Sequence, residues 1–583
     1  MLDGDYVDAV TTSALRGPSR WVLPGALDDA AARALAAELH LPLAVCQLLC
    51  ARGFGDSAAA KRFLRPRFDQ LHDPLSMMGL ADAVERVVTA IERGETILVH
   101  GDYDVDGMAS TALLMRALRT FGARVVPFVP RRIEDGYDLS AAGVAAARQA
   151  GAGLVITADC GTNAARAVDE LTAAGIDTII TDHHLPGPET RLPRCVAVLN
   201  PRQPGCGYPD KDLAAAGVAF KLALALARRL GAPEAPVFAL LDLVALATVA
   251  DVAPLCGENR VFVRAGLRLM ADSRNVGLRA LIRASGLEGK SLTAGRVGFI
   301  LAPRLNAVGR LARGLRGVEL LTTENEADAL RIAREMEECN RRRQELDRAT
   351  LDQARALVGA LDLDATYGLV LAEEGWHPGV IGIVASRIVE ETGRPTVMVA
   401  LDGESGRGSG RSIPAFDLHS ALAECAPMLD RFGGHRAAAG VSLARANLAA
   451  FAERFNAVAR ARLEPDDLVA EVRVDLEVSI DDVNGDLESV LRHFEPFGIG
   501  NPAPALLARG VRLAGPPRAL AEHGLKLRLA TATGELDAVA WGAAHRVSEI
   551  AAAPGGLDLV FRVERDDWQG VSRLQAKVTD FRV

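Results

Sequence analysis

The feature that most constrains how this chain can fold is a repeated pattern, in which a short apolar run ends in aspartate or histidine. It occurs three times: Thr96–Val99 leads into His100-Gly101-Asp102-Tyr103-Asp104-Val105-Asp106, Leu154–Thr157 leads into Ala158-Asp159, and Thr178–Ile180 leads into Thr181-Asp182-His183-His184. Further apolar runs at Arg124–Val129 and Val196–Leu199 alternate with helical segments, which predicts a parallel α/β sheet. Ligands bind beyond the carboxyl ends of parallel strands, so we expect a functional site at this edge.

Helical patterns dominate the middle of the chain. Two helices are expected over about 213–230 and 236–249, and the second is apolar nearly all round, which predicts a buried helix that ends at Asp251. A charged helix is expected over about 323–360, with Thr323 and Glu326 in capping-box spacing at its start. A helix of this kind predicts a connector between two lobes.

The last third of the chain reads as a second α/β unit followed by a β-rich part. Strands are expected at Tyr367–Ala372 and Thr396–Ala400, around a helix that starts near Gly379. From about residue 468 the sequence has short alternating segments with Gly and Pro turns, which predicts a small β-barrel.

A chain of 583 residues is too long for one hydrophobic core, so these patterns are read as separate domains. The expected parts are an N-terminal segment that packs on the first α/β domain (about 1–85), the parallel α/β domain (86–320), the connector helix (321–365), the second α/β domain (366–465) and the C-terminal barrel (466–583).

The net charge and the spacing of the cysteines indicate which binding partners and which cellular compartment to expect. The net charge of −9 argues by itself against a polyanionic partner. If metal ions neutralise several of the acids, however, the acidic total is compatible with nucleic acid bound in a basic groove. The eight cysteines contain no paired C-x-x-C spacing, which is typical of a reduced compartment. The acidic N-terminus and the absence of an apolar run near ~20 residues predict a soluble, unprocessed, cytoplasmic protein without a membrane partner.

The acids that follow the strands are too close together to be ionised without cations. Three aspartates lie between residues 102 and 106, and like charges at this spacing repel one another unless metal ions neutralise them. An aspartate after a strand most often caps the next helix, so no single case is strong evidence. Four convergent cases, the last of them Asp251, favour a metal site.

These segments, in this order, resemble the four motifs of the DHH phosphoesterase family, with Asp182-His183-His184 as the signature triplet. The resemblance implies two ions, Mn²⁺ or Mg²⁺, that clamp a phosphodiester. It implies that Asp159 bridges the ions, that Asp104 and His100 hold one of them, and that Asp106, His183 and Asp251 hold the other. Asp102 and Asp182 are then expected to orient ligands from outside the coordination sphere. His184 is expected to donate to the scissile phosphate.

Further motifs resemble the branch of this family that degrades single-stranded DNA. They are Pro130–Tyr137, which is followed by Asp138 where a glycine is common, and Ala302–Arg310, Gly375–Ala385, Gly408–Ser412, Gly433–His435 and Glu495–Pro502. The resemblance implies a DHH domain, a second, DHHA1-like lobe that binds substrate, and an OB-fold as the barrel.

The same motifs supply candidate substrate-binding residues, namely Arg132, Arg304, Asn306, Arg310, Ser409, Arg411 and His435. The four arginines are flanked by Gly or Pro and are expected in loops, where a guanidinium fork could hold phosphate. Ser409 and Arg411 are expected to hold a 5′-terminal phosphate, with the amides of Gly408 and Gly410 forming an anion nest. A surface ion pair is the alternative for each arginine, and a structural role is the alternative for His435.

The function that this resemblance implies is a 5′-to-3′ exonuclease specific for single-stranded DNA, which releases mononucleotides by two-metal-ion hydrolysis in recombination and repair. One alternative is a phosphodiesterase of the same chemistry that acts on short oligonucleotides, and another is a non-catalytic nucleic-acid scaffold. The family works with a helicase and a single-strand-binding protein, but no residue of this chain identifies either partner.

Overall fold

The computed structural model describes residues 19–25, 28–132, 134–136, 138–187, 191–520, 523–551, 556–568 and 571–583. The chain forms two compact units. Unit 1 contains Arg62–Arg341 and Phe494–Ala503, and unit 2 contains the described residues up to Lys61, Arg342–His493 and Pro504–Val583.

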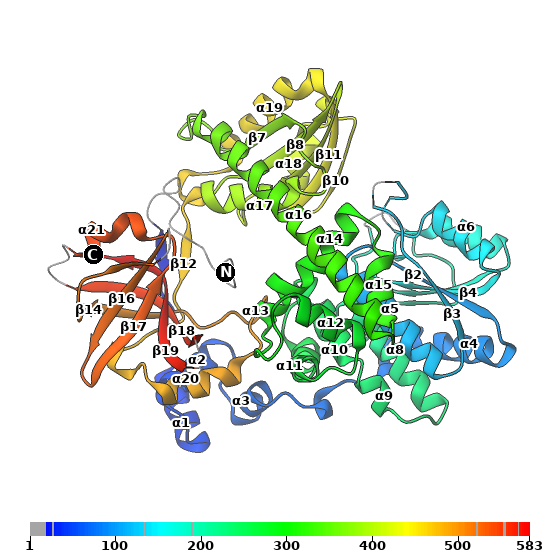
Figure 1. Cartoon of the computed structure of the whole chain (residues 1–583), viewed down its shortest axis with the longest axis horizontal. Helices are drawn as coiled ribbons and strands as arrows, with labels where there is room; N and C mark the ends of the chain where they lie inside the picture. The colour runs from blue at the N-terminus through cyan, green and yellow to red at the C-terminus, as the bar shows by residue number, and fades with distance from the viewer. Residues whose placement is uncertain are drawn as a thin grey trace. The chain divides into compact units, whose positions relative to one another are not determined.

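A five-stranded parallel sheet is the centre of unit 1 (Figure 1), and it confirms the predicted α/β class. Its strands lie in the order β3 (Arg124–Phe128), β2 (Thr96–Gly101), β4 (Ala152–Ala158), β5 (Asp177–Thr181) and β6 (Ala197–Leu199). The strand order reverses between β2 and β4, which makes the carboxyl ends of these strands a topological switch point. Open α/β sheets bind ligands at this position.

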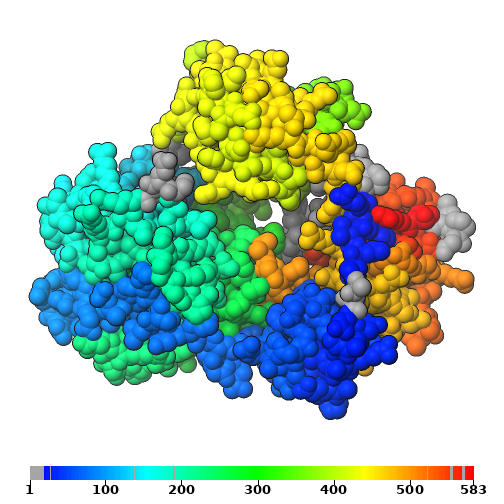
Figure 2. Space-filling model, turned by 180° about the vertical axis from the view of Figure 1, so that it is seen from behind, coloured from blue at the N-terminus to red at the C-terminus, as the bar shows by residue number. Residues whose placement is uncertain are grey.

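Helices cover both faces of this sheet. Leu98 and Val155 pack on the face of α6 (Ala141–Gln149) and α7 (Ala165–Ala173), whose segment gives the cyan surface in Figure 2. Ile97 and Ile156 point to the opposite face. The helices that contribute to that core include α4 (Leu80–Arg93), α5 (Val105–Thr120), α8 (Ala215–Arg229) and α10 (Leu241–Ala250). Burial on two faces explains why these strands are continuous apolar runs rather than alternating ones.

The remaining helices of unit 1 follow β6 in the chain. They include α9 (Ala235–Phe238), α11 (Gly257–Ala271), α12 (Val276–Ala284), α13 (Ala294–Arg296), the π-helical turn η3 (Val297–Leu301), α14 (Ala302–Leu311), α15 (Leu315–Thr322) and the start of α16 (Glu326–Gly359). The helix expected over 236–249 is thus two helices, α9 and α10. The helix α16 is capped by Asn325, whose side chain accepts from the amides of Ala327 and Asp328, so the predicted Thr323–Glu326 capping box is wrong.

Unit 2 contains two large sheets. The first has the order β10 (Arg431–Gly434), β11 (Ala438–Ala444), β9 (Ser405–Arg411), β8 (Thr396–Asp402) and β7 (Leu369–Glu374). The helices that accompany it are α17 (Ile381–Thr392), α18 (Leu418–Glu424) and α19 (Leu448–Arg462). The second sheet has the order β13 (Leu476–Glu477), β14 (Leu506–Val511), β18 (Leu557–Trp568), β19 (Val571–Arg582), β17 (Gly534–Ala540), β16 (Gly524–Thr531) and β15 (Arg518–Leu520).

The glycine-rich stretch that was expected to be a loop is the central strand β9. Gly408 and Gly410 lie opposite Val399 and Val397 in β8 and opposite Val441 and Ala439 in β11, so the sheet ladder occupies this backbone on both sides. The predicted anion nest of their amides is therefore wrong. Because side chains alternate along a strand, Ser409 and Arg411 share the other face of β9.

The N-terminal segment differs from the expectation that residues 1–85 pack together on the first α/β domain. Its described part before Lys61 belongs to unit 2, where β1 (Arg20–Val22) pairs in parallel with β12 (Glu471–Arg473). Within the part of the chain that the structure describes, no helix has the length and apolar character needed to cross a membrane.

Candidate metal centre

The loop after β2 brings acids to the switch point of the sheet. Asp104 caps α5 by accepting from the amide of Gly107 at 3.0 Å, so the common role of an aspartate after a strand is present here as well. A Cβ on Gly107 would lie 2.5 Å from the backbone nitrogen of Asp102, which means that only glycine lets the first turn of α5 pack on this loop. Asp104 and Gly107 therefore begin the helix α5 and at the same time hold the acids of this loop at the edge of the sheet.

The histidine of the signature triplet lies among acids from three other elements. The Nε2 atom of His183 is 3.2 Å from Asp159 Oδ1, 3.7 Å from Asp251 Oδ2 and 4.0 Å from Asp106 Oδ2. Among the residues that the structure describes, ligand atoms lie within 4.8 Å of one another in three groups, which are Asp106–His183–Asp251, Asp159–His183–His184 and Asp102–Asp104–Asp159. Asp159 and His183 each belong to two of these groups, and Asp159 is the residue expected to bridge two ions.

Burial and mutual repulsion make these acids hard to ionise. Burial, and next the charge of Asp104, raises the pKa of Asp106 to about 6. Burial, and next the charge of Asp106, raises the pKa of Asp251 to about 8 and holds the pKa of Asp159 well above its usual range. Burial lowers the pKa of His183 to about 4, which leaves a neutral imidazole that can donate a lone pair to a cation.

Several atoms of the cluster are buried without a hydrogen-bond partner. They include Asp102 Oδ1, Asp159 Oδ1 and His183 Nε2. Buried polar atoms are rarely left unpaired, and a divalent cation would satisfy all three. The donor set of carboxylates with one imidazole suits Mn²⁺ or Mg²⁺, so the residues present fit the expected ions.

Two aspartates of the motifs are fixed by hydrogen bonds. Asp106 accepts from the amides of Ala215 and Ala216, at 2.8 and 2.9 Å, at the N-terminus of α8. Asp182 Oδ1 is 2.7 Å from His184 Nδ1. Burial would lower the pKa of His184, but this hydrogen bond and the charge of Asp182 raise it to about 9. His184 is therefore a cation beside the cluster.

His100 is placed differently from the other expected ligands. It is fully buried, its Nδ1 atom is 3.5 Å from Cys160 Sγ, and its Nε2 atom lies against Gly143 of α6. Burial lowers its pKa to about 4. Among the described residues, the three ligand groups do not include His100.

The arginines of unit 1 take two different arrangements. Arg132 lies over the ring of Tyr103, 5.1 Å from its centroid, and the charge of Arg310 also acts on the Tyr103 hydroxyl. Tyr103 separates Asp102 from Asp104 in the sequence. Arg132 and Arg310 therefore lie close to the acid loop, which is the segment 102–106 after β2. Arg304 instead forms an ion pair with Glu337 of α16. Arg304 and Arg310 lie in the helix α14 rather than in a loop, which corrects that expectation, and Asn306 lies in the same helix.

Ser409 and Arg411 lie together against the first turn of α17. Arg411 Nη1 donates to Ser409 Oγ at 3.1 Å. A Cβ on Gly382 would meet Ser409 Oγ at 2.8 Å and Arg411 Nη2 at 3.0 Å, so the missing side chain of Gly382 leaves the space that both groups use. His435 is exposed, and its amide donates to Ala438, the residue opposite Arg411 in the sheet.

The sequence also held a signal for a residue that was not singled out. Arg202 follows β6, which ends at the same edge as the other strands, and its charge acts on both His183 and Asp251. The loop that carries it is tied to the signature triplet, because Asn200 Nδ2 donates to the carbonyl of His184 at 2.8 Å. Arg202 itself is held by Asp212 at 2.8 Å.

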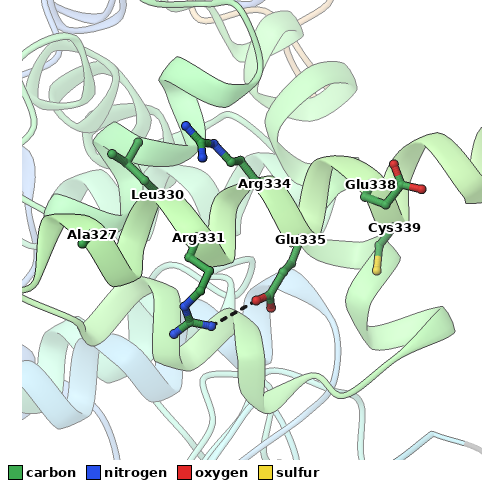
Figure 3. Close-up of a pocket in the computed structure, with 7 residues that line it drawn as sticks. All are labelled: Ala327, Leu330, Arg331, Arg334, Glu335, Glu338 and Cys339. Carbon is green, nitrogen blue, oxygen red and sulfur yellow. Dashed lines mark hydrogen bonds and ion pairs between the residues drawn. The ribbon is translucent and has the colours of Figure 1, made fainter.

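A hollow elsewhere in unit 1 offers no comparable chemistry. It runs along α16 between Ala327 and Cys339 and is lined by two arginines, two glutamates and three small or apolar residues, and Arg331 and Glu335 among them form an ion pair at 3.0 Å (Figure 3). These side chains lie along a single helix and do not converge on a ligand. The acid cluster is therefore the candidate centre.

Family models match three parts of the chain. They are the DHH family, N-terminal domain, over residues 96–248, the DHHA1 domain over residues 365–461 and the RecJ OB domain over residues 474–580. The first contains the motif residues from His100 to His184 and ends before Asp251, and the second contains Ser409 and Arg411.

Individual proteins are similar over most of the chain. The single-stranded-DNA-specific exonuclease RecJ of Bacillus subtilis is 35% identical over 557 residues, which cover 95% of this chain and 70% of that protein. The crystal structure of RecJ from Thermus thermophilus in complex with Mn²⁺ matches with a TM-score of 0.83 and 34% identity, over 97% of this chain and 79% of that one. The structure of the same protein in complex with Mg²⁺ matches with a TM-score of 0.77.

Proposed function

Because the chain belongs to the RecJ family of single-stranded-DNA-specific exonucleases, we infer that it is a metal-dependent nuclease that hydrolyses single-stranded DNA. The observation that carries this function is the convergence of His183 with Asp106, Asp159 and Asp251 at the switch point of the parallel sheet. The expected class of enzyme and its dependence on Mn²⁺ or Mg²⁺ agree with the relatives. We place its work in DNA recombination and repair.

We propose that this site would hold two ions, one through Asp104 and Asp159 and the other through Asp106, His183 and Asp251. Asp159 lies 3.2 Å from His183 Nε2 and would serve both. The ions, when bound, supply a water activated for attack and charge that stabilises the departing oxygen. Asp102 belongs to the group of Asp104 and Asp159, so its expected place outside the coordination sphere stays a proposal.

The protein's own side chains hold and neutralise the phosphodiester. His184, kept protonated by Asp182, is placed to donate a hydrogen bond to a phosphate oxygen, because its ring is partly exposed and 3.8 Å from Asp159 Oδ1. Arg132 and Arg310, beside Tyr103, add positive charge next to the acid loop. Arg202 is a further cation on the side of His183 and Asp251.

We propose that the direction of digestion depends on the second lobe. Ser409 and Arg411 would bind the 5′-terminal phosphate together with the first amides of α17, which is 12 residues long and presents its positive end there. Removal of nucleotides would then proceed from the 5′ end and release mononucleotides. Cytoplasmic localisation and cooperation with a helicase and a single-strand-binding protein stay proposals that rest on the family resemblance.

Digestion of single strands labelled at the 5′ or the 3′ end, with and without Mn²⁺, tests the function. We expect metal-dependent release of a labelled mononucleotide at early times from the 5′-labelled strand alone. A protein that binds the strand without cleaving it would be a scaffold, and a protein that cleaves only short oligonucleotides would have the narrower activity.

The polarity proposal is tested with Arg411→Ala. Loss of charge-assisted hydrogen bonds worth about 1.5–3 kcal/mol should raise KM for 5′-phosphorylated strands by roughly 10- to 150-fold, and it should affect 5′-hydroxyl strands much less. Arg407→Ala is the matched control, because Arg407 lies on the same face of β9 and is exposed. Equal slowing of both substrates would mean that Arg411 contacts the body of the strand or supports the fold.

A further inference from the structure

Three exposed apolar side chains belong to segments of unit 1 that carry a ligand of the metal centre or pack on such a segment. Leu185 follows His184 and is 63% exposed, Val252 follows Asp251 and is 61% exposed, and Phe299 of η3 is 56% exposed. Single exposed apolar residues are common on protein surfaces, but three of them around one site are informative. Leu185, Val252 and Phe299 are called the apolar rim.

The chain connectivity fixes two members of the apolar rim close to the ligands. His183 Nε2 and Asp251 Oδ2 are 3.7 Å apart. Leu185 comes two residues after His183, and Val252 comes one residue after Asp251. Both exposed side chains therefore flank the same pair of ligands.

Packing brings the third member to the same region. Phe299 is adjacent to Gly298, where a Cβ would lie 3.3 Å from Cγ1 of Val249 in α10. Val249 precedes Asp251 by two residues, so η3 packs on the end of the helix that delivers this ligand. A π-helical turn is rare and often occurs at functional sites.

Val252 has a strained backbone conformation. Its φ is 59°, in the left-handed region that β-branched residues avoid. The amide of Ala253 donates to the carbonyl of Thr248 at 3.1 Å, so α10 ends in a turn that favours glycine at the position of Val252. The exposed side chain gains little from burial to offset this strain, and strain beside a ligand points to a functional demand on the side chain.

We propose that the apolar rim binds the bases of the nucleotides that flank the cleaved phosphodiester. Phe299 offers a ring for stacking, and Leu185 and Val252 offer aliphatic contacts. Every base has an apolar face, so this contact suits an enzyme that accepts all four nucleotides in turn. The cations of the centre recognise only phosphate, and the apolar rim adds affinity that depends on the base. This inference rests on the proposed function and deepens it.

The test combines a protein change with a substrate change. Hydrolysis is measured for a 5′-phosphorylated single strand with natural bases and for the same strand with abasic residues at its 5′ end. Phe299→Ala should raise KM for the natural strand by about 5- to 150-fold with kcat retained, and it should have little effect on the abasic strand. The wild-type protein should lose a similar factor when the bases are removed, and Phe299→Trp should keep the wild-type preference.

Controls separate this inference from the proposed function. Phe68→Ala removes an aromatic side chain that is 49% exposed and packs against the ring of Phe238, outside the apolar rim. This variant should leave KM unchanged for both the natural and the abasic strand. Mn²⁺ titration of Phe299→Ala should match that of the wild type. If Phe299→Ala slows both strands equally, base contact by Phe299 is refuted. If wild-type protein cleaves neither strand, the proposed function itself fails.

Val252→Gly gives a second, independent test. Glycine relieves the left-handed strain, so the melting temperature should rise, while loss of the side chain should raise KM for the natural strand. A more stable protein with unchanged KM would remove Val252 from the apolar rim.

Discussion

Asp159 combines a strained backbone with a crowded side chain. Its φ is 68°, and its amide donates to the carbonyl of Thr181 at 3.0 Å, which fixes the loop after β4. Asparagine adopts this conformation readily, so Asp159→Asn tests the carboxylate without a change of backbone. The substitution Asp159→Asn therefore removes the charge of the side chain while it keeps the backbone conformation.

We expect Asp159→Asn to abolish hydrolysis, because Asp159 belongs to two of the three ligand groups and is proposed to hold both ions. Without metal its melting temperature at pH 8 should be no lower than that of the wild type, since a buried amide costs less than a buried carboxylate. The exposed Asp169, paired with Arg191 at 3.0 Å, gives the control Asp169→Asn. Activity above about a tenth of wild type would contradict the bridging assignment.

The raised pKa values predict how metal binding depends on pH. Asp106 and Asp251 have pKa values of about 6 and about 8 in the folded protein without metal, above the ordinary value of 3.8. The folded state holds these protons more tightly than the unfolded state, so their contribution to stability is fully present below pH 3.8 and is lost as pH rises from there through about 6 for Asp106 and about 8 for Asp251. Cations bind the ionised acids and therefore restore more stability at high pH.

The measurement is the rise in melting temperature on replacing EDTA with Mn²⁺, at pH 6, 7 and 8. The rise should grow with pH across this window, because fewer protons must be displaced at higher pH. A metal-induced rise that is constant from pH 6 to 8 would mean that these carboxylates are already ionised without metal.

Asp138 shows how a single residue can depart from a family pattern and still fit. Its φ is 71°, a conformation that explains why glycine is common at this position. Its Oδ1 atom accepts from the amides of Leu139 and Gly161, at 2.8 and 2.7 Å, and Gly161 lies two residues after Asp159. These two hydrogen bonds hold the loop that carries Asp159 and offset the strain of the left-handed backbone at Asp138.

At the scale of elements, α8 connects the fold to the site. Its N-terminal amides hold Asp106, and in its middle the buried Lys221 pairs with Glu258 of α11 at 2.5 Å. Lys221 also donates to the carbonyl of His72, and Tyr208 donates to Glu258. Because Lys221 and Glu258 are buried, water cannot replace a partner that a substitution removes.

We expect Lys221→Met to lower the free energy of unfolding by about 3–5 kcal/mol, because it leaves the buried carboxylate of Glu258 without its cation. Urea denaturation measures the loss. The double variant Lys221→Met, Glu258→Gln should lose less than the single variant, since no uncompensated charge remains. Equal losses in both would show that packing rather than charge determines the effect.

At the scale of the whole molecule, affinity for DNA must come from a few cations, because the net charge is −9. Basic residues of the second sheet in unit 2 are largely engaged, as Lys526 pairs with Asp537 and Arg528 pairs with Glu535. Each phosphate contact contributes about −0.7 to the slope of log affinity against log salt for single strands.

We therefore expect Arg411→Ala to reduce the magnitude of this slope by about 0.7, and Arg528→Ala to leave it unchanged. Binding of a labelled single strand, measured at several salt concentrations with Ca²⁺ in place of the catalytic ion, gives both values. A large change for Arg528→Ala would assign phosphate contacts to the β-rich part instead.

The sequence by itself determined the parallel α/β class, the order of the motifs and the family. The reason is that these depend on local patterns: apolar runs mark strands that are buried on both faces, and acids follow three of the strands, β2, β4 and β5, within a few residues. The residues of the candidate centre could be named for the same reason, since the carboxyl ends of parallel strands meet at one edge.

Only the tertiary structure decided which partners these residues have. The amides of α8 reach Asp106 across 109 positions of sequence, β1 pairs with β12, and β9 is a central strand although its glycines suggest a loop. Arg202 joins the centre through the loop after β6, and His100 turns toward Cys160 and Gly143. Such contacts follow from the packing of distant segments, which no local spacing or periodicity specifies.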